Sequence, residues 1–544
     1  MKNIQDSLVT SIKNSLKALK LDKIDNADIY LDLPSEVRFG DFSSNIALRL
    51  TKSIKKSPHE IAKAMVDVIK PQLAKGPLKD YLIEIKVEGA GFINFYISDK
   101  YFYEQLKDLI VRGTKALKAD IGKGRRVLVE FVSANPTGPL SVAHARQAAV
   151  GDSLVNILDF LGFKVKREYY NNDEGNQINI LGQSVELRLK ELNGEKVEFP
   201  ENYYQGDYIY DIARQVQSLK PKAQSMGEFA AEYISSIIKK ELDDFGIKFD
   251  YWYSQKTLRT SGKVQEALAF LKKKGLLYKQ DGALWFKSTQ FGDDKDRVII
   301  KSDGAYTYIA TDIAYHREKY RRGFKWLINL WGPDHHGYIN RLKAAVQGFG
   351  QSADSLSIII VQLASIFKEG KLLEMSTRRG QYITLREVLD EVGKDASRFF
   401  FLMRRVSSHL DFDLDIAKKQ TAENPVYYVQ YAYARISSIL RNSQVKIKKN
   451  VDMSVLKEPE ELALAKKSLQ FLYTLNACLS TQDPYMLTMY LQALSEAFHK
   501  FYDRHRVLGQ DDALTAARLA LIEATKIVLA TGLELLGVSR PEKM

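Results

Sequence analysis

Helical and strand-like hydrophobic patterns alternate through the first part of the chain. Apolar residues recur at helical spacing over 5–21 and again over 57–73. Strand-like alternation follows over 83–87 and resumes over 92–97 after a glycine-containing break. This order predicts a small α+β module that ends near residue 115.

A βαβ unit is predicted next. Residues 126–132 form an apolar run that suits a buried parallel strand, and a Pro/Gly loop over 133–140 follows it. A helical pattern over 141–161, with Ser141 at the N-cap, leads to a second strand over 164–170. Such a unit directs backbone N–H groups and the positive end of a helix dipole to the carboxyl edge of the strand, where a nucleotide phosphate could bind. The loop has neither a G-x-G-x-x-G pattern nor a Walker P-loop, so dehydrogenases and P-loop enzymes lose support.

The last part of the chain has helical periodicity. Apolar stripes over 429–440, 462–475, 486–498 and 514–536 predict a helical bundle. Most of these apolar positions are expected to form its core.

Composition bears on the number of domains, the kind of partner and the cellular compartment. With 544 residues, of which 45% are hydrophobic, the chain exceeds one compact domain. Its formal net charge of +13 suits a polyanionic partner such as nucleic acid, although a solvated basic surface would give the same value. The single Cys478 excludes an internal disulfide and a cysteine-rich zinc site, so we expect a cytoplasmic protein. No apolar run has the length of a signal peptide core or of a membrane span, so no membrane partner is expected.

Several blocks of sequence, in order along the chain, carry a family resemblance. Residues 133–144, Ser-Ala-Asn-Pro-Thr-Gly-Pro-Leu-Ser-Val-Ala-His, look like the HIGH region of arginyl-tRNA synthetases. Blocks 170–177, 307–317 and 331–338 are similar to the same family. The resemblance covers essentially the whole chain, because it continues at 375–380, 410–415, 423–431 and 537–544.

This resemblance implies an ATP-dependent class I ligase with a multidomain α/β fold. Such an enzyme converts ATP, L-arginine and tRNA(Arg) to AMP, diphosphate and L-arginyl-tRNA(Arg) through an arginyl-adenylate. The implied domains are an N-terminal additional α+β domain that contacts the tRNA elbow or D-loop, 1–115, a Rossmann-type catalytic domain with insertions, 116–420, and an all-α helical anticodon-binding bundle, 421–544.

The resemblance assigns the first ATP-binding segment to the HIGH-like region. The family motif usually has two histidines, which stabilise the charge that builds as pyrophosphate leaves. Here Ser141 stands at the first position and His144 at the second, while Ala143 replaces the motif's glycine. The implied catalytic residues on this segment are Ser141 and His144. The implied ATP-binding residues are Ala134, Asn135, Pro136, Thr137, Gly138, Pro139, Leu140, Ser141, Val142, Ala143 and His144.

A second signature loop, usually Lys-Met-Ser-Lys-Arg, appears as residues 374–378. Glu374 and Thr377 replace both lysines, which ordinarily neutralise the triphosphate. The nearest fixed cations, Arg378 and Arg379, therefore become catalytic candidates. Met375 and Ser376 complete the implied ATP-binding set.

Arginine would need acidic or amide acceptors in a pocket shielded from water. By resemblance, Asp312 would pair with the substrate guanidinium, Tyr308 would line the pocket, and Asn135 would hold the amino or carboxylate end. Gln255 stands where the family usually has a glutamate, and an amide accepts fewer charge-assisted bonds. The implied arginine-binding residues are Ser133, Asn135, Tyr308, Asp312 and Gln255.

Candidate tRNA contacts lie at both ends of the chain. Phe92 and Asn94 match family positions that contact a D-loop base, and their alternation puts both on one face of a strand. Tyr431 and Arg435 could stack on anticodon bases and bind phosphates, and Met544 would lie beside them. The alternative for each of these residues is ordinary packing.

No protein-held metal is expected. The sequence Asp334-His335-His336 could suggest zinc, but adjacent histidines rarely point the same way. Mg²⁺ would accompany ATP, held largely by phosphates and water. We also expect a monomer.

Two other functions stay open from the sequence. One is a tRNA-binding paralogue with impaired catalysis, which the changes at Ser141, Glu374 and Thr377 motivate. The other is a class I synthetase for a different amino acid, because relatives share helical anticodon domains.

Overall fold

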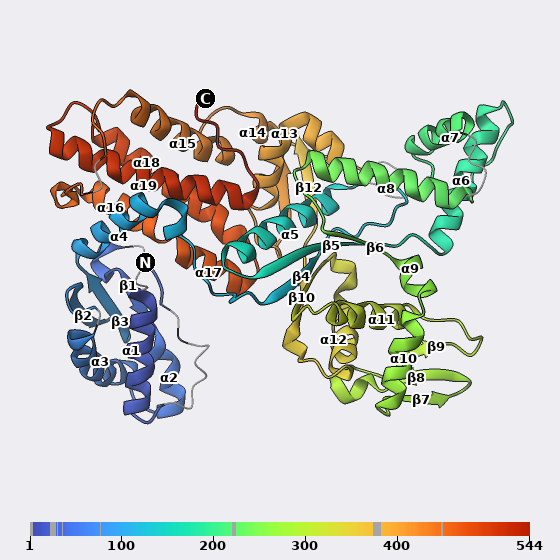
Figure 1. The fold of residues 1–544 in the computed structure, drawn as a ribbon, viewed down its shortest axis with the longest axis horizontal. Coiled ribbons are helices and arrows are strands. Elements are labelled where there is room, and N and C mark those ends of the chain that lie inside the picture. The colour runs from blue at the N-terminus through green and yellow to red at the C-terminus, as the bar shows by residue number, and fades with distance from the viewer. Residues whose placement is uncertain are drawn as a thin grey trace. The chain divides into compact units, whose positions relative to one another are not determined.

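The computed structural model describes residues 4–21, 29, 31–34, 36–76, 78–219, 225–373, 382–447 and 450–544 (Figure 1). They form two compact units. Unit 1 takes in residues 1–117, 438–470 and 497–528, and unit 2 takes in residues 118–437, 471–496 and 529–544. Helices α15 (Pro425–Asn442), α18 (Tyr485–Arg504) and α19 (Asp512–Leu536) contribute residues to both units.

Unit 1 contains a three-stranded antiparallel sheet with strand order β1-β3-β2. Phe95 in the central strand lies opposite Phe42 on one side and Ile85 on the other. The elements from the first part of the chain are α1 (Ile4–Ala18), β1 (Phe42–Ser44), α2 (Ile46–Ile54), α3 (Pro58–Lys75), β2 (Leu82–Glu88), β3 (Phe92–Ile97) and α4 (Asp99–Arg112).

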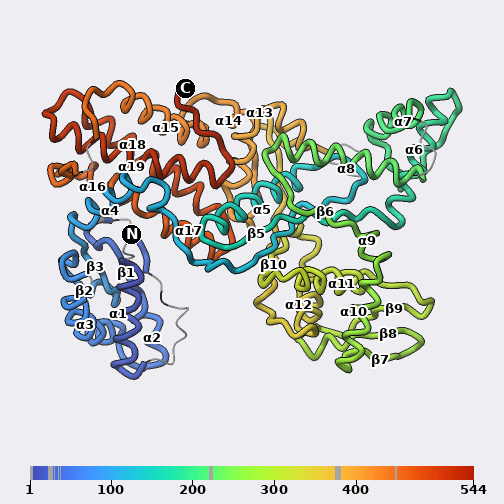
Figure 2. Tube along the Cα trace, viewed as in Figure 1, coloured from blue at the N-terminus to red at the C-terminus, as the bar shows by residue number. Residues whose placement is uncertain are grey.

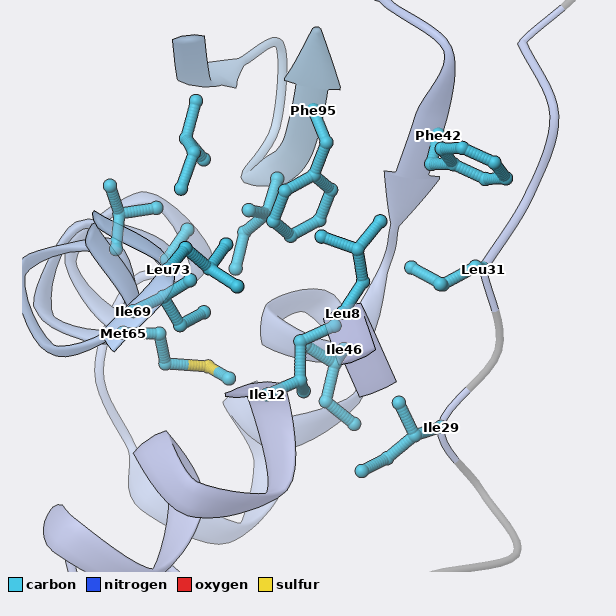
Figure 3. Packing of buried hydrophobic residues seen from close by; sticks show 14 of the residues in the cluster. Leu8, Ile12, Ile29, Leu31, Phe42, Ile46, Met65, Ile69, Leu73 and Phe95 are labelled. Carbon is cyan, nitrogen blue, oxygen red and sulfur yellow. The ribbon is translucent and has the colours of Figure 1, made fainter. Parts of the chain in front are cut away.

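Helices α1 and α3 cover this sheet with their apolar faces. Leu8 and Ile12 from α1 and Ile69 from α3 are fully buried in one cluster with Phe95 (Figure 3). Helix α3 begins at a capping box, in which the Ser57 side chain accepts from the Glu60 N–H at 3.3 Å and the Glu60 carboxylate accepts from the Ser57 N–H at 3.1 Å. The predicted helix–strand pattern is therefore confirmed in this part of the chain.

Unit 1 is completed by residues from the second half of the chain. The buried Tyr103 hydroxyl of α4 donates to the Leu456 carbonyl at 2.5 Å. Lys466 of α16 (Pro459–Leu469) forms an ion pair with Asp41 at 2.7 Å. These contacts join segments that are far apart in sequence.

Unit 2 is built on a five-stranded parallel sheet with strand order β11-β10-β4-β5-β6. Strand β4 is central, and the chain adds strands to both of its sides. The carboxyl end of β4 is therefore a topological switch point, where ligands bind in open parallel sheets. The strands are β4 (Arg126–Glu130), β5 (Lys164–Asn171), β6 (Tyr251–Ser254), β10 (Trp326–Trp331) and β11 (Leu356–Ile360).

Helices and smaller sheets occupy the connections of unit 2 (Figure 2). Two further three-stranded sheets have strand orders β7-β8-β9 and β13-β12-β14. The connecting elements are α5 (Val142–Phe160), α6 (Asn176–Leu192), α7 (Tyr208–Leu219), α8 (Met226–Asp244), α9 (Gln255–Thr260), α10 (Lys263–Lys273), β7 (Leu277–Gln280), β8 (Ala283–Phe286), β9 (Arg297–Ile300), α11 (Tyr308–Arg321), α12 (Ile339–Gly348), β12 (Ala364–Lys368), β13 (Lys371–Leu372), α13 (Leu385–Phe401), β14 (Leu410–Asp413), α14 (Leu414–Lys418) and α17 (Phe471–Thr481).

Two predicted elements have different bounds in the structure. The strand predicted over 126–132 ends at Glu130, because Val132 and Ser133 have positive φ angles that an extended strand excludes. The single helix predicted over 462–475 is two helices, α16 and α17, which are separated at Gln470. The other three helices predicted after 428 are confirmed.

Helix α5 is tied into unit 2 by a buried ion-pair network. Its Asp152 accepts from the Arg398 Nη2 at 2.5 Å and from the Arg167 Nε at 2.9 Å. Arg398, which is fully buried in α13, also donates through Nε to the Leu536 carbonyl at the end of α19, at 2.8 Å. These bonds compensate the buried charges and hold α5 against β5, α13 and the end of α19.

Candidate active site

The loop after β4 leaves the sheet at its switch point and is fixed by tyrosine hydroxyls. Tyr169 donates to the Ala134 carbonyl at 2.8 Å, Tyr208 to the Thr137 carbonyl at 2.7 Å, and Tyr382 to the Pro139 carbonyl at 2.9 Å. The middle of the loop is crowded, because a Cβ atom on Gly138 would lie 3.1 Å from the Tyr382 hydroxyl oxygen and 3.2 Å from that of Tyr208. These contacts restrain the position of the loop.

Helix α5 begins at Ser141, which is its N-cap as predicted. The Ser141 backbone N–H donates to the His144 Nδ1 at 3.2 Å, and the Ser141 Oγ lies 3.0 Å from the same nitrogen. Because Nδ1 accepts a hydrogen bond, the neutral imidazole carries its proton on Nε2. Burial lowers the pKa of His144 to about 4, although the nearby Asp334 carboxylate opposes this shift. His144 therefore offers an N–H donor and no positive charge near neutral pH.

The chain just after the second signature segment bonds directly to the first loop. The Val142 N–H donates to the Ile383 carbonyl at 3.1 Å, and the Leu385 N–H donates to the Leu140 carbonyl at 2.7 Å. A bridge pairs Ser141 with Thr384, which is the N-cap of α13. Residues 382–385, which follow the second segment in the described chain, are thus adjacent to the start of α5.

The second segment itself lies outside the described residues. The predicted catalytic residues Arg378 and Arg379, and the predicted ATP contacts Met375 and Ser376, belong to it. Their roles stay predictions.

The candidate arginine residue Asp312 lies on α11 with one carboxylate oxygen already bonded. The Tyr338 hydroxyl donates to its Oδ2 at 2.6 Å. Burial raises the pKa of Asp312 to about 6, although the hydrogen bond from Tyr338 acts in the opposite direction. Tyr308, one turn earlier on the same helix face, is 83% exposed. The structure therefore holds Asp312 in place and leaves the Tyr308 ring in solvent.

Other candidate arginine residues gather around Tyr170 at the carboxyl end of β5. The Tyr170 N–H donates to the Ser133 Oγ at 3.1 Å, and its hydroxyl donates to the Gln255 Oε1 at 2.9 Å. The charge of Asp312 helps to raise the pKa of Tyr170, after burial as the larger cause, so this hydroxyl lies within electrostatic range of Asp312. Asn135 bonds elsewhere, because its Nδ2 donates to the Gln177 Oε1 at 2.7 Å.

Sequence reasoning gave no role to the two tyrosines that organise this site. Tyr170 and Tyr338 both stood in blocks that carried the family resemblance. The available signal was positional, since Tyr170 lies near the end of β5 and Tyr338 follows β10, and both strands end at the carboxyl edge of the sheet.

Beneath Asp312 lies a buried polar network whose members are paired. His316 Nδ1 is 2.9 Å from the Asp312 carbonyl oxygen, and its Nε2 is 2.8 Å from the Asn329 Nδ2. The Asn329 Oδ1 accepts from Lys319 at 3.3 Å, and Lys319 forms a buried ion pair with Glu130. Burial lowers the pKa of His316 well below its ordinary value, so the imidazole is neutral, with Nδ1 as donor and Nε2 as acceptor.

The first pair of candidate tRNA residues lines a cavity of about 360 Å³ in unit 1. Phe92 is 37% exposed, whereas Asn94 is buried. The Asn94 Oδ1 accepts from the Ser43 Oγ at 2.6 Å, and its Nδ2 donates to Glu88 at 2.8 Å. The structure therefore brings Phe92 and Asn94 together with a fixed amide and an acidic neighbour.

The remaining tRNA candidates belong to unit 2. Tyr431 and Arg435 are one turn apart on α15, where the Arg435 guanidinium bonds the Tyr431 hydroxyl and lies 5.1 Å from the centre of its ring. Tyr427 stacks on Tyr431 with ring centres 6.1 Å apart. Met544 is exposed at the chain end.

The described part of the chain shows neither a cluster of metal ligands nor a membrane-spanning helix. Within it, no three His, Cys, Asp or Glu side chains are arranged to hold a metal ion. Asp334 and His335 form only an exposed pair at 3.4 Å. None of the helices in the described ranges is long and apolar enough to cross a membrane.

Comparisons with known proteins agree along the length of the chain. Residues 6–97 match "Arginyl tRNA synthetase N terminal domain", residues 105–409 match "tRNA synthetases class I (R), catalytic domain", and residues 429–544 match "DALR anticodon binding domain". An arginine–tRNA ligase from Citrifermentans bemidjiense is 46% identical over 531 residues, which cover 95% of each chain. One from Carboxydothermus hydrogenoformans is 42% identical over 560 residues, covering 100% of this chain and 99% of the relative. The solved arginyl-tRNA synthetase of Thermus thermophilus has the same fold, with a TM-score of 0.77 at 22% identity, over 99% of this chain and 100% of that one.

Proposed function

Because the chain belongs to the arginyl-tRNA synthetase family, we propose that it charges tRNA(Arg) with arginine through the residues around the carboxyl ends of β4, β5 and β10. The chain is a class I arginine–tRNA ligase that uses ATP as a substrate. The observation that carries the proposed site is the meeting of the 133–144 loop, the N-terminus of α5 and the 382–385 segment at the switch point of the parallel sheet.

In the first step the arginine carboxylate attacks the α-phosphorus of ATP. An O–P bond forms, the bond to the bridging oxygen breaks, and pyrophosphate leaves with the electron pair. Asp312 pairs with the substrate guanidinium, while Ser133, Asn135 and Gln255 hold the rest of the amino acid. Holding the two reactants in line lowers the entropic cost of the reaction, and no covalent enzyme intermediate is needed.

ATP binds along the 134–144 loop in this proposal. The His144 Nε2–H donates to phosphate oxygens, and the positive end of the α5 dipole adds to this stabilisation. Since His144 is neutral, the cationic part of the work falls to Arg378 and Arg379 on the second segment. Mg²⁺ would accompany the triphosphate and neutralise part of its charge, held mainly by phosphates and water.

In the second step the 3′-terminal hydroxyl of tRNA attacks the carbonyl carbon of the adenylate and AMP leaves. Phe92 and Asn94 contact a D-loop base in the 360 Å³ cavity, while Tyr431, Arg435 and Met544 contact the anticodon. In this proposal the chain divides at residues 115 and 420 into three domains that carry these roles. We also propose that the protein works as a cytoplasmic monomer, which sedimentation of the purified protein and fractionation of cells would test.

The two rival functions lose support. The relatives that match the whole chain are arginine–tRNA ligases, which argues against a different amino acid. Nothing in these relatives favours a paralogue with impaired catalysis.

Arginylation of tRNA by the purified protein tests the proposed site. With ATP and Mg²⁺ present, we expect the wild type to charge tRNA(Arg). His144→Asn should lower kcat about 10²-fold to 10³-fold, because a donor to the developing charge is lost. Asp312→Asn should raise the KM for arginine by about 10²-fold or more, because the guanidinium loses its ionic partner.

Matched controls come from the exposed face of α3 in unit 1. His59→Asn and Asp67→Asn make the same chemical changes at exposed positions, and we expect them to charge tRNA at the wild-type rate. If the wild-type protein binds tRNA but does not charge it, the result would instead favour the paralogue with impaired catalysis. Wild-type behaviour of His144→Asn or Asp312→Asn would refute the role proposed for that residue.

A further inference from the structure

The Asp312 carboxylate is held by one oxygen only. Tyr338 donates to Oδ2 at 2.6 Å, and within the described ranges no hydrogen bond reaches Oδ1. A carboxylate with one oxygen fixed cannot rotate freely, so the direction of its second oxygen is set as well. The geometry thus presents a single anionic acceptor.

Tyr338 is itself fixed by contacts that do not involve its hydroxyl. Its ring packs edge-on against Trp331, with ring centres 6.1 Å apart, and the Arg341 guanidinium lies 4.6 Å from the ring centre. The residue is also the N-cap of α12. A phenylalanine could keep these ring contacts while losing only the hydrogen bond.

The surroundings compensate the negative charge of Asp312 only in part. The charge of Lys319 lowers the pKa of Asp312, but Lys319 is already paired with Glu130, and His316 is neutral. The Asp312 Oδ1 is therefore available to pair with an external cation, because no buried group of the network pairs with it. A planar guanidinium with several N–H donors suits such a partially shielded acceptor.

We propose that Tyr338 is a positioning residue for arginine, which orients the Asp312 carboxylate so that Oδ1 faces the substrate guanidinium. This inference rests on the proposed pairing of Asp312 with arginine. In the alternative arrangement the Tyr338 hydroxyl would act as a plug: it would block the guanidinium site and would have to leave Oδ2 before arginine could bind. The two arrangements predict changes of opposite sign when the hydroxyl is removed.

The same hydrogen bond should extend arginine binding to lower pH. Burial raises the pKa of Asp312 to about 6, and the bond from Tyr338 counters this shift because it stabilises the ionised form. Loss of the hydroxyl should therefore raise the pKa further and move the loss of binding to higher pH. The groups that act on or face Asp312 are Tyr338 and His335 after β10, Glu130 of β4, Tyr170 of β5, and His316 and Lys319 of α11.

Calorimetric titration of the full-length protein with L-arginine, from about pH 5 to about pH 8, tests this role directly. For Tyr338→Phe we expect the Kd at neutral pH to rise by roughly tenfold, and the midpoint of the pH dependence to move up by about one unit. Tyr320→Phe is the matched control, because this tyrosine of α11 donates to or accepts from Ser355 instead. It should leave both quantities unchanged.

Each result separates this inference from the proposed function. Tighter arginine binding by Tyr338→Phe would establish the plug, and an unchanged Kd and pH midpoint would refute any role of the hydroxyl. Asp312→Asn gives the independent check. If it binds arginine like the wild type, the proposed pairing fails; if it loses binding while Tyr338→Phe does not, only the positioning role fails.

Discussion

His144 enters the proposed chemistry as a neutral donor, and its burial has a second consequence for stability. The folded-state pKa is about 4, below the ordinary value of 6.5. Unfolding therefore takes up a proton wherever the pH lies between these two values. The free energy of unfolding should decrease as the pH falls through this window.

Replacement of His144 by glutamine should weaken this pH dependence. The wild-type urea midpoint should fall as the pH is lowered from about 6.5 to about 4, and His144→Gln should show a smaller fall, because the side chain no longer binds a proton on unfolding. His59→Gln, at an exposed position of α3, serves as the control. If the urea midpoint of His144→Gln changed with pH as steeply as that of the wild type, the pKa of His144 would not be lowered in the folded protein.

At the residue scale, sequence identified the loop but not its partners. The resemblance pointed to Ser141 and His144, and the N-cap position of Ser141 is confirmed. The hydrogen bond from Tyr338 to Asp312 joins the start of α12 to α11, which become neighbours only in the folded protein. Local periodicity carries no information on such a pair, because it reports neighbours along one helix or strand.

At the scale of elements, the position of helix α5 depends on a network of buried charges that is remote from the proposed phosphate contacts. Arg398 is fully buried and reaches both Asp152 and the end of α19. Removing one partner of a buried ion pair leaves the other charge unpaired, which costs more than loss of an exposed pair. The position of α5 should therefore be sensitive to this arginine.

Arg398→Met should destabilise unit 2 by about 3–5 kcal/mol. Arg167→Met should cost less, because the Arg167 side chain is 21% exposed and water can solvate the remaining Asp152 charge. Thermal unfolding of the wild type and both variants measures this ranking. Equal shifts in Tm would mean that the two arginines share the stabilisation of Asp152 evenly.

Periodicity predicted α1, α3, α5 and the helices after residue 428, but it gave no prediction for α6, α8 or α13, and two predicted boundaries differ from the structure. Strand β4 ends early because Val132 and Ser133 adopt left-handed backbone angles, and no glycine marks the turn. The break between α16 and α17 falls at Gln470, where neither proline nor glycine interrupts the apolar pattern. The short strands β7, β8 and β9 are four residues each, too short for a periodic signal.

The charge of the whole molecule predicts how its two substrates respond to salt. A net charge of +13 favours a polyanion, whose binding releases counterions, whereas arginine makes one local ion pair. A fourfold rise in salt, from about 50 to about 200 mM, should weaken tRNA binding at least about tenfold and arginine binding less than about threefold. Filter binding for tRNA and calorimetry for arginine would measure both. Similar salt dependence of the two would argue against a broad electrostatic contact with tRNA.

The composition of unit 1 has a consequence for how the protein is made. Its first part, up to residue 117, leaves the ribosome early, but residues 438–470 and 497–528 are translated near the end. The core shared by α1, α3 and β3 can form from the early part alone. The Tyr103 side of α4, in contrast, is completed only after Leu456 has been translated. At about 5–20 residues per second this wait lasts on the order of tens of seconds. During translation the Tyr103 side of α4 therefore stays uncovered until the last part of the chain has been made.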